Sequence, residues 1–227
     1  MSSDMTFVLI PGAGGEAWYW HLVVPLLEER GHRGIAVELP AADPDAGWAE
    51  YADAGAEAGD GAGPVTVVGQ SMGGFTAPLL VGRLPVERIV LVNAMIPIPG
   101  ETGGQWWDAV GQRSAREEQD RKQGRDPDAP FDERVMFFHD VPPAIVDEAF
   151  SRGEPRQADL PFAQPWPLSA WPEVPTSGIA GRDDRIFPAD FQRRVAKERL
   201  GIDLTVVPGG HLISLSNPEG LVESLLA

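Results

Sequence analysis

Residues 69–73, with the sequence Gly-Gln-Ser-Met-Gly, constrain the fold more than any other part of the chain. They follow the β-branched run 65–68, which is typical of a buried strand, and precede residues 74–77, where an apolar helix can begin. A Gly-x-Ser-x-Gly sequence between a strand and a helix is typical of a nucleophile elbow, a sharp turn that lifts the serine hydroxyl clear of the sheet. The same pattern also fits a plain glycine-rich turn. The interpretation of Ser71 as a nucleophile therefore depends on finding a base and an acid.

Apolar β-type runs alternate with helical stretches along most of the chain. We expect strands at 6–10, 34–38, 65–68, 88–93, 176–180 and 202–207, and helices at 17–30, 51–61, 75–84, 107–122, 143–151, 188–199 and 218–226. This alternation predicts an α/β protein with a mostly parallel sheet of about six strands flanked by helices.

The alternation stops between residues 97 and 171, which hold many prolines and charged helical stretches but no convincing strand. We interpret this segment as a helical lid inserted after the strand that ends near Asn93. Residues 1–96 and 172–227 would then form one core, and the whole chain a single domain.

Charge and composition narrow the classes of partner. The net charge is −16, from 18 basic and 34 acidic residues, which argues against nucleic-acid binding. The chain has no cysteine, so it offers no disulfide, no thiolate metal site and no cysteine nucleophile. It shows no leader sequence and no apolar run of 18 residues, and we expect a cytoplasmic protein with no membrane partner. We expect neither a metal nor a cofactor.

A base and an acid follow Ser71 in the order that a serine nucleophile requires. Asp184 lies just beyond the expected strand 176–180, and His211 just beyond the strand 202–207. The carboxyl ends of parallel strands meet at one edge of the sheet, where ligands bind. A neutral imidazole can accept the serine proton, and a carboxylate can hold that imidazole in the correct tautomer.

Other aspartate and histidine residues are alternatives for the acid and the base. Asp183 is as acidic as its neighbour Asp184, and either could cap the loop instead. His21, His32 and His139 are alternative histidines, but none of them follows a late strand. We assign Asp184 as the acid and His211 as the base.

Acyl transfer also needs donors for the developing oxyanion. We expect them to be the backbone N–H groups of Met72, which follows Ser71, and of Ala13, in the loop after the first strand. The glycines of residues 12–15 could instead form a phosphate-binding loop. They lack the Gly-x-Gly-x-x-Gly spacing, and no Lys-Ser/Thr pair follows them.

The chain resembles the α/β-hydrolase family, and within it the branch of small plant methyl esterases and hydroxynitrile lyases. The resemblance runs over nearly the whole length. It is carried by residues 8–13 with Trp18 and Trp20, and by residues 69–74, 92–97, 138–142, 181–184, 211 and 216–219. It implies the same roles for Ser71, Asp184, His211, Ala13 and Met72. One departure is Pro11, where the family usually has histidine, and this change bears on the shape of the loop.

The resemblance also distinguishes ester hydrolysis from cyanohydrin cleavage. The lyases of this branch have a lysine after the histidine base and a threonine in the first loop, whereas this chain has Leu212 and Gly12. A leucine cannot stabilise departing cyanide, so ester hydrolysis is favoured. Aromatic residues of the lid, with Trp106, Phe137 and Phe138 as substrate-binding candidates, suggest a pocket for a small hydrophobic or aromatic ester.

The main hypothesis is a cofactor-independent serine esterase that acts through an acyl-enzyme, as a monomer or a homodimer. The same residues could serve a lactonase, a perhydrolase or a C–C hydrolase. A receptor that retains the three residues but only binds a small molecule is the alternative from another class.

Overall fold

Six parallel strands form the central sheet of the computed structural model, which describes residues 4–227. The strands are β1 (Thr6–Ile10), β2 (Arg33–Ala36), β3 (Val65–Gln70), β4 (Val86–Val92), β5 (Thr176–Gly181) and β6 (Leu204–Val207). Their order in the sheet is β2-β1-β3-β4-β5-β6, and every neighbouring pair is parallel. The prediction of an α/β fold with about six strands is confirmed.

The strands are apolar on both faces because helices cover both sides of the sheet. Successive strand residues point to opposite faces. Phe7 and Leu9 of β1 therefore pack in one apolar cluster, with residues of α1 (Val23–Glu29) and α11 (Pro218–Leu226). Val8 and Ile10 pack in the other cluster, with residues of α2 (Trp48–Ala58) and α9 (Ala189–Leu200).

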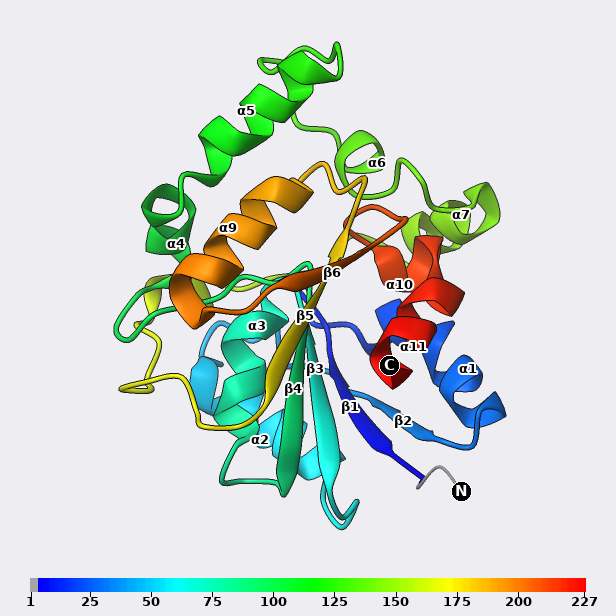
Figure 1. Ribbon diagram of the computed structural model, residues 1–227, viewed down its shortest axis with the longest axis vertical. Helices are drawn as coiled ribbons and strands as arrows, with labels where there is room; N and C mark the ends of the chain where they lie inside the picture. Colours follow the sequence, from blue (N-terminus) through cyan, green and yellow to red (C-terminus); the bar gives the residue numbers. More distant parts are fainter. Residues whose placement is uncertain (1–3) are drawn as a thin grey trace.

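The helices that cover the sheet come from both halves of the chain (Figure 1). Helices α1 and α11 contact each other on one face, and α2, α3 and α9 cover the other face. The helical elements of this core are η1 (Ala17–Trp20), α1 (Val23–Glu29), α2 (Trp48–Ala58), α3 (Gly73–Thr76), η2 (Ala77–Leu80), α9 (Ala189–Leu200), α10 (Ile213–Ser216) and α11 (Pro218–Leu226).

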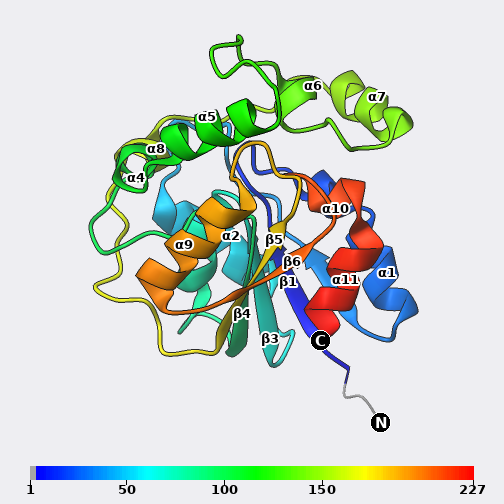
Figure 2. The ribbon, with the colours of Figure 1, turned by 45° about the horizontal axis from the view of Figure 1, so that its top comes forward.

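The segment between β4 and β5 forms further helices that lie across the carboxyl ends of the strands (Figure 2). These helices are α4 (Gly103–Ala109), α5 (Gln112–Lys122), α6 (Glu133–Met136), α7 (Pro143–Ser151) and α8 (Leu160–Ala163). None of the helices within residues 4–227 has the length and apolar character needed to cross a bilayer.

Three of the expected helices are divided or change type in the structure. The helix expected over 107–122 is two helices, because Gly111 adopts a left-handed conformation with φ of 64° between them. The helix expected over 75–84 changes to a 3-10 helix at Ala77, because the ring of Pro78 is incompatible with the preceding α-helical turn. The helix expected over 17–30 begins as the 3-10 turn η1 and becomes α-helical only at Val23.

The strand order brings four loops together at one edge of the sheet. The chain passes from β1 outward to β2 and then crosses to β3 on the other side of β1. The loops after β1 and β3 therefore leave adjacent strands at a topological switch point, with Ile10 paired to Gly69. Strands β5 and β6 are also parallel neighbours, with Gly181 opposite Val207, so the loops that follow them leave the sheet side by side. The residues after these four strands form the floor of the candidate site.

Candidate active site

Ser71 occupies a tight turn at the end of β3. Its φ of 52° lies in the left-handed region, which costs a non-glycine residue roughly 1–3 kcal/mol. The surrounding backbone holds this conformation, because the Ser71 N–H donates to Val92 O at 3.1 Å and its carbonyl accepts from the N–H groups of Gly74 and Met95. A Cβ at Gly73 would lie 2.7 Å from Pro11 O, and one at Gly74 only 2.0 Å from Met95 O. Glycine is therefore required at both positions for the turn to close.

Ser71, His211 and Asp184 form a continuous chain of hydrogen bonds. The Ser71 hydroxyl lies 3.0 Å from His211 Nε2, and His211 Nδ1 lies 2.8 Å from Asp184 Oδ2. Donation from Nδ1–H to the carboxylate leaves Nε2 free to accept the proton of the serine hydroxyl. The structure thus brings together the three residues that the sequence singled out.

Asp184 is fully buried, and its carboxylate is held by several donors. Oδ1 accepts from the backbone N–H groups of Ile186 at 2.8 Å and Phe187 at 2.9 Å. Oδ2 accepts from Gln192 Nε2 at 3.2 Å in addition to the imidazole. Burying a polar group is costly without hydrogen-bond partners, and here these partners also fix the orientation of the carboxylate toward His211.

The alternative acid and bases lie elsewhere. Asp183 points away and pairs with Arg182 at 3.0 Å, and hydrogen bonds from Arg182 lower the pKa of the Asp183 carboxyl. His21 lies 2.7 Å from Trp18 O, and the His32 ring accepts from the N–H of Met5. His139 lies beside Asp140 in the segment between β4 and β5, residues 97–171, which we call the insertion.

Asn93, at the end of β4, links the loops that carry the acid and the base. Its side-chain amide donates to the carbonyls of Gly210 at 3.0 Å and His211 at 2.9 Å, and its Oδ1 accepts from the N–H of Gly181 at 2.6 Å. Because β4 pairs with β5, and β5 pairs with β6, one amide at the end of β4 can reach the loops after both of these strands. The sequence marked Asn93 only as the end of a strand, and its bridging contacts become visible only in the folded structure.

Both expected oxyanion donors lie at the candidate site, as does Ser71. Ala13 and Met72 both line the cavity that contains the serine. Among residues 4–227, no protein atom accepts a hydrogen bond from the backbone N–H of Ala13 or of Met72. The loop that carries Ala13 approaches the serine closely, since a Cβ at Gly12 would lie 2.9 Å from the Cβ of Ser71. Both N–H groups are therefore available to a ligand.

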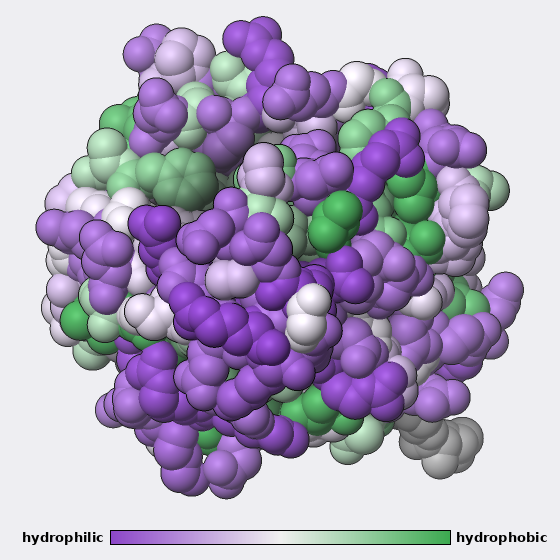
Figure 3. Space-filling view, turned by 90° about the horizontal axis from the view of Figure 1, so that it is seen from above, coloured by the Kyte–Doolittle hydropathy of each residue, from purple (hydrophilic) through white to green (hydrophobic). Residues whose placement is uncertain are grey.

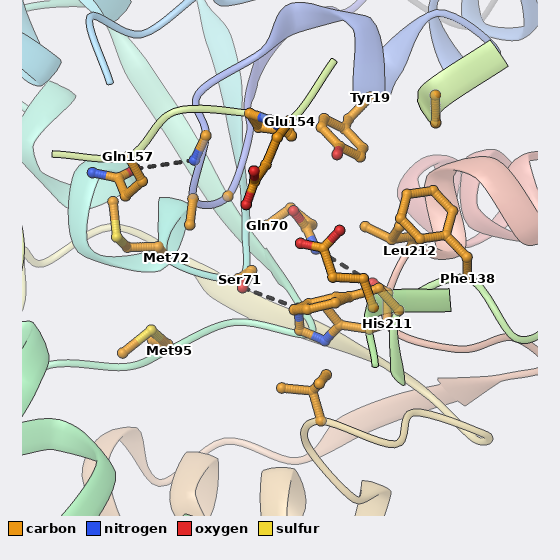
Figure 4. A pocket seen from close by; sticks show the side chains of 18 of the residues that line it. Tyr19, Gln70, Ser71, Met72, Met95, Phe138, Glu154, Gln157, His211 and Leu212 are labelled. Atoms are coloured by element: carbon orange, nitrogen blue, oxygen red, sulfur yellow. Dashed lines mark hydrogen bonds between the residues drawn. The ribbon is translucent and has the colours of Figure 1, made fainter. Parts of the chain in front are cut away.

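A cavity of about 530 Å³ opens above the serine, between the sheet edge and the insertion (Figure 4). Its walls are largely aromatic and aliphatic and include Tyr19, Met95, Trp107, Phe137, Phe138, Phe150, Phe162, Ile186, Phe187 and Leu212. Phe137 and Phe187 also pack edge-on against the His211 ring, with centroids 5.3 and 5.1 Å away.

The structure does not place Trp106 at this cavity, in contrast to the expectation from sequence. Its side chain is fully buried, donates from Nε1 to Ile96 O at 3.1 Å and packs against Phe187 and Phe191. Trp107 lines the cavity instead. Successive helix residues point about 100° apart, so one of the two tryptophans faces the core and the other the cavity.

Comparison with known proteins now identifies the family. A model described as the alpha/beta hydrolase family matches residues 7–224. The chain belongs to the alpha/beta hydrolase family.

Relatives of this protein include both hydrolases and a hydroxynitrile lyase. A pyrethroid hydrolase of Sphingobium wenxiniae is 29% identical over 244 residues, covering 96% of this chain and 85% of the relative. An alpha-hydroxynitrile lyase of Arabidopsis thaliana is 26% identical over 248 residues, covering 97% and 95%. The crystal structure of polyneuridine aldehyde esterase matches with a TM-score of 0.74 at 21% identity, covering 99% and 98% of the two chains. The resemblance to this branch is confirmed, and the protein is an alpha/beta hydrolase with esterase-type relatives.

Several polar residues of the hydrolase cavity could not be found from the sequence. Glu133, Glu154 and Gln157 come from the insertion, which shows no regular pattern, and Tyr19 comes from η1. Burial, followed by the nearby carboxylates Glu16 and Glu133, raises the pKa of Tyr19 to about 12, so this phenol stays neutral. Gln192, which supports Asp184, lies on the buried face of α9, and its partner could not be identified without the fold.

Proposed function

We propose that this alpha/beta hydrolase cleaves small carboxylic esters with a hydrophobic or aromatic part, with Ser71 as the nucleophile and an acyl-enzyme as the intermediate. The observation that carries the proposal is the unbroken hydrogen-bond chain from Ser71 through His211 to Asp184, at the floor of an apolar cavity. The esterase-type relatives support it.

The geometry fits a two-step reaction. Ser71 Oγ attacks the ester carbonyl carbon while His211 Nε2 takes the hydroxyl proton, and the carbonyl oxygen becomes an oxyanion that accepts hydrogen bonds from Ala13 and Met72 N–H. Collapse of this intermediate breaks the bond to the alcohol oxygen, which receives the proton from the imidazolium. A water molecule, deprotonated by His211, then attacks the acyl carbon. Collapse of this second intermediate breaks the bond to Ser71 Oγ, which takes the proton back from the imidazolium, and the carboxylic acid leaves. Asp184 orients the imidazole and stabilises its cation throughout.

The cavity supports the substrate class. A volume of about 530 Å³ with mainly apolar walls suits a small hydrophobic or aromatic ester. In this proposal the helices of residues 97–171 act as the lid that forms the upper wall. Leu212 lines the cavity directly after His211, so no cation stands where a leaving cyanide would need one. This favours ester hydrolysis over cyanohydrin cleavage.

The test combines covalent labelling with turnover. Purified protein should form a 1:1 adduct with a fluorophosphonate probe and hydrolyse p-nitrophenyl butyrate. Ser71→Ala should abolish the adduct and lower kcat/KM at least a hundredfold, because no other group replaces the nucleophile. Ser224→Ala, in helix α11 and hydrogen-bonded to Gly220 O, is the matched control and should leave both unchanged.

Other outcomes would point to other functions. Wild-type protein that forms no adduct and turns over no ester, but is thermally stabilised by a small hydrophobic ligand, would contradict the proposal and indicate a receptor. An adduct with turnover of lactones or β-diketones but not of open-chain esters would keep Ser71 as the nucleophile and change the substrate class.

A further inference from the structure

The turn that carries Ala13 has little stability of its own. The N–H of Gly15 donates to Gly12 O at 3.1 Å, which closes a four-residue turn with Ala13 and Gly14 at its centre. Gly14 has φ of 86°, close to the value of about 80° at the third position of a type II turn. Because glycine accepts either sign of φ, the peptide between Ala13 and Gly14 can rotate to the type I arrangement at little cost. Something outside the turn must fix its orientation.

A single side chain of the insertion holds this peptide. Gln157 Oε1 accepts from the N–H of Gly14 at 3.0 Å, across 143 positions of the sequence (Figure 4). If the peptide rotated, the Ala13 carbonyl would face this oxygen in place of the N–H, and the two would repel. The contact therefore selects one of the two turn conformations.

Gln157 is itself anchored to the core. Its Nε2 donates to the hydroxyl of Tyr51 at 3.0 Å, and Tyr51 is fully buried in helix α2. The next residue, Ala158, donates its N–H to Ala41 O at 2.7 Å. Pro155 lies against the other side of the turn, where a Cβ on Gly14 would come within 2.6 Å of the proline Cβ. These contacts fix the position of the amide relative to the sheet.

We propose that Gln157 is a positioning residue for the oxyanion site: by holding Gly14 it fixes the turn that carries Ala13, and so the position of the Ala13 N–H, which belongs to the preceding peptide. The inference rests on the proposed function, in which that N–H stabilises the oxyanion. It gives the insertion a second role besides covering the cavity, because the donor is correctly placed only while the segment around Gln157 is docked on the core. The site then assembles from the turn after β1, the elbow after β3 and the insertion together.

A matched pair of glutamines provides the test. Gln164 also belongs to the insertion, is half-buried like Gln157 and accepts a backbone N–H of the core, that of Trp48, at 2.9 Å through its Oε1. It does not line the cavity. Gln157→Met and Gln164→Met each remove one such hydrogen bond while keeping the length of the side chain.

We expect Gln157→Met to lower kcat for p-nitrophenyl butyrate roughly 10- to 100-fold with little change in KM, somewhat less than loss of an oxyanion donor costs. Gln164→Met should retain at least half of the activity.

A second readout separates misplacement of the donor from general loosening of the fold. In a thionoester the charge develops on sulfur, whose longer bond fits donors placed for oxygen poorly, so its hydrolysis depends less on Ala13 N–H. The ratio of kcat/KM for ester over thionoester should fall about tenfold in Gln157→Met and stay within twofold of wild type in Gln164→Met. This ratio does not depend on the fraction of enzyme that is folded.

Tyr51→Phe removes the anchor without touching the cavity. It should lower the ratio two- to fivefold on its own and have no further effect in a Gln157→Met background, because it acts through the same amide. An unchanged ratio in Gln157→Met, or an equal change in Gln164→Met, would overturn the inference while ester turnover by wild type upheld the proposed function. Absence of ester turnover in wild type would overturn both.

Discussion

Two adjacent carboxylates at the end of β5 have opposite environments. Asp184 is buried, accepts two backbone N–H groups and faces the His211 ring, whereas Asp183 is partly exposed and paired with Arg182. We expect Asp184→Asn to lower kcat about 10⁴-fold, because an amide stabilises the wrong tautomer and supplies no counter-charge to the imidazolium. Asp183→Asn makes the same chemical change one residue away and should keep most of the activity. Measurement of kcat for a p-nitrophenyl ester in both variants tests the assignment, and a severe loss in the Asp183 variant would refute it.

The residues of the candidate site were predictable where the chain order and the strand ends constrained them. Ser71, Asp184 and His211 each follow a β-type run, and in a parallel sheet such positions converge. The choice between Trp106 and Trp107 was not predictable, because it depends on the rotation of one helix about its axis. The role of Gln157 could not be read from the sequence either, because it depends on a contact between segments 143 residues apart.

At the level of elements, the core was far more predictable than the insertion. Strands such as β1 and β3 are buried on both sides, so they require continuous apolar, β-branched runs. The short helices α6 and α8 cover a cavity rather than a core, and four residues are too few to show a helical period. Helix α10 was missed for the same reason. The break at Gly111 was visible only as a glycine, without its left-handed conformation.

The contact between the insertion and the loop after β6 should depend on pH. His139 and Asp140 lie against Gly210, where Asp140 Oδ2 accepts the Gly210 N–H at 2.5 Å. Burial lowers the pKa of the His139 imidazole, the charge of Arg185 acts in the same direction, and Asp140, Asp183 and Asp184 oppose them. The unfolded chain has an unperturbed histidine pKa near 6.5, so below that pH it binds more protons than the folded chain. His139 should therefore reduce stability as the pH falls below about 6.5.

Urea unfolding at pH 7.5 and pH 5.5 tests this prediction. The free energy of unfolding of wild type should fall between the two pH values by more than that of His139→Gln, which cannot be protonated. The curve of His21→Gln, which changes a histidine outside this contact, should follow wild type. An identical loss in wild type and His139→Gln would show that the pKa of His139 does not contribute.

At the scale of the whole molecule, both the net charge of the chain and the charged residues of the cavity are negative. The chain carries a net charge of −16, and the face seen from above the insertion is mainly hydrophilic, with hydrophobic side chains scattered over it (Figure 3). Among the described residues that line the cavity, two are carboxylates, Glu133 and Glu154, and none is lysine or arginine. Glu154 extends into the cavity (Figure 4). A negative field focused in a cleft attracts cationic ligands and repels anions.

This field should set a preference among esters of similar shape. For a p-nitrophenyl ester whose acyl chain ends in a trimethylammonium group, kcat/KM should exceed that of the matched chain ending in a carboxylate by about tenfold at low ionic strength. The ratio should fall toward unity in about 1 M salt, where the screening length is near 3 Å. Glu154→Gln should reduce it severalfold. Glu57→Gln removes the same charge from the exposed face of α2, away from the cavity, and should leave the ratio nearly unchanged. An equal reduction in both variants would mean that the net charge of the chain, and not the carboxylate in the cavity, discriminates between the substrates.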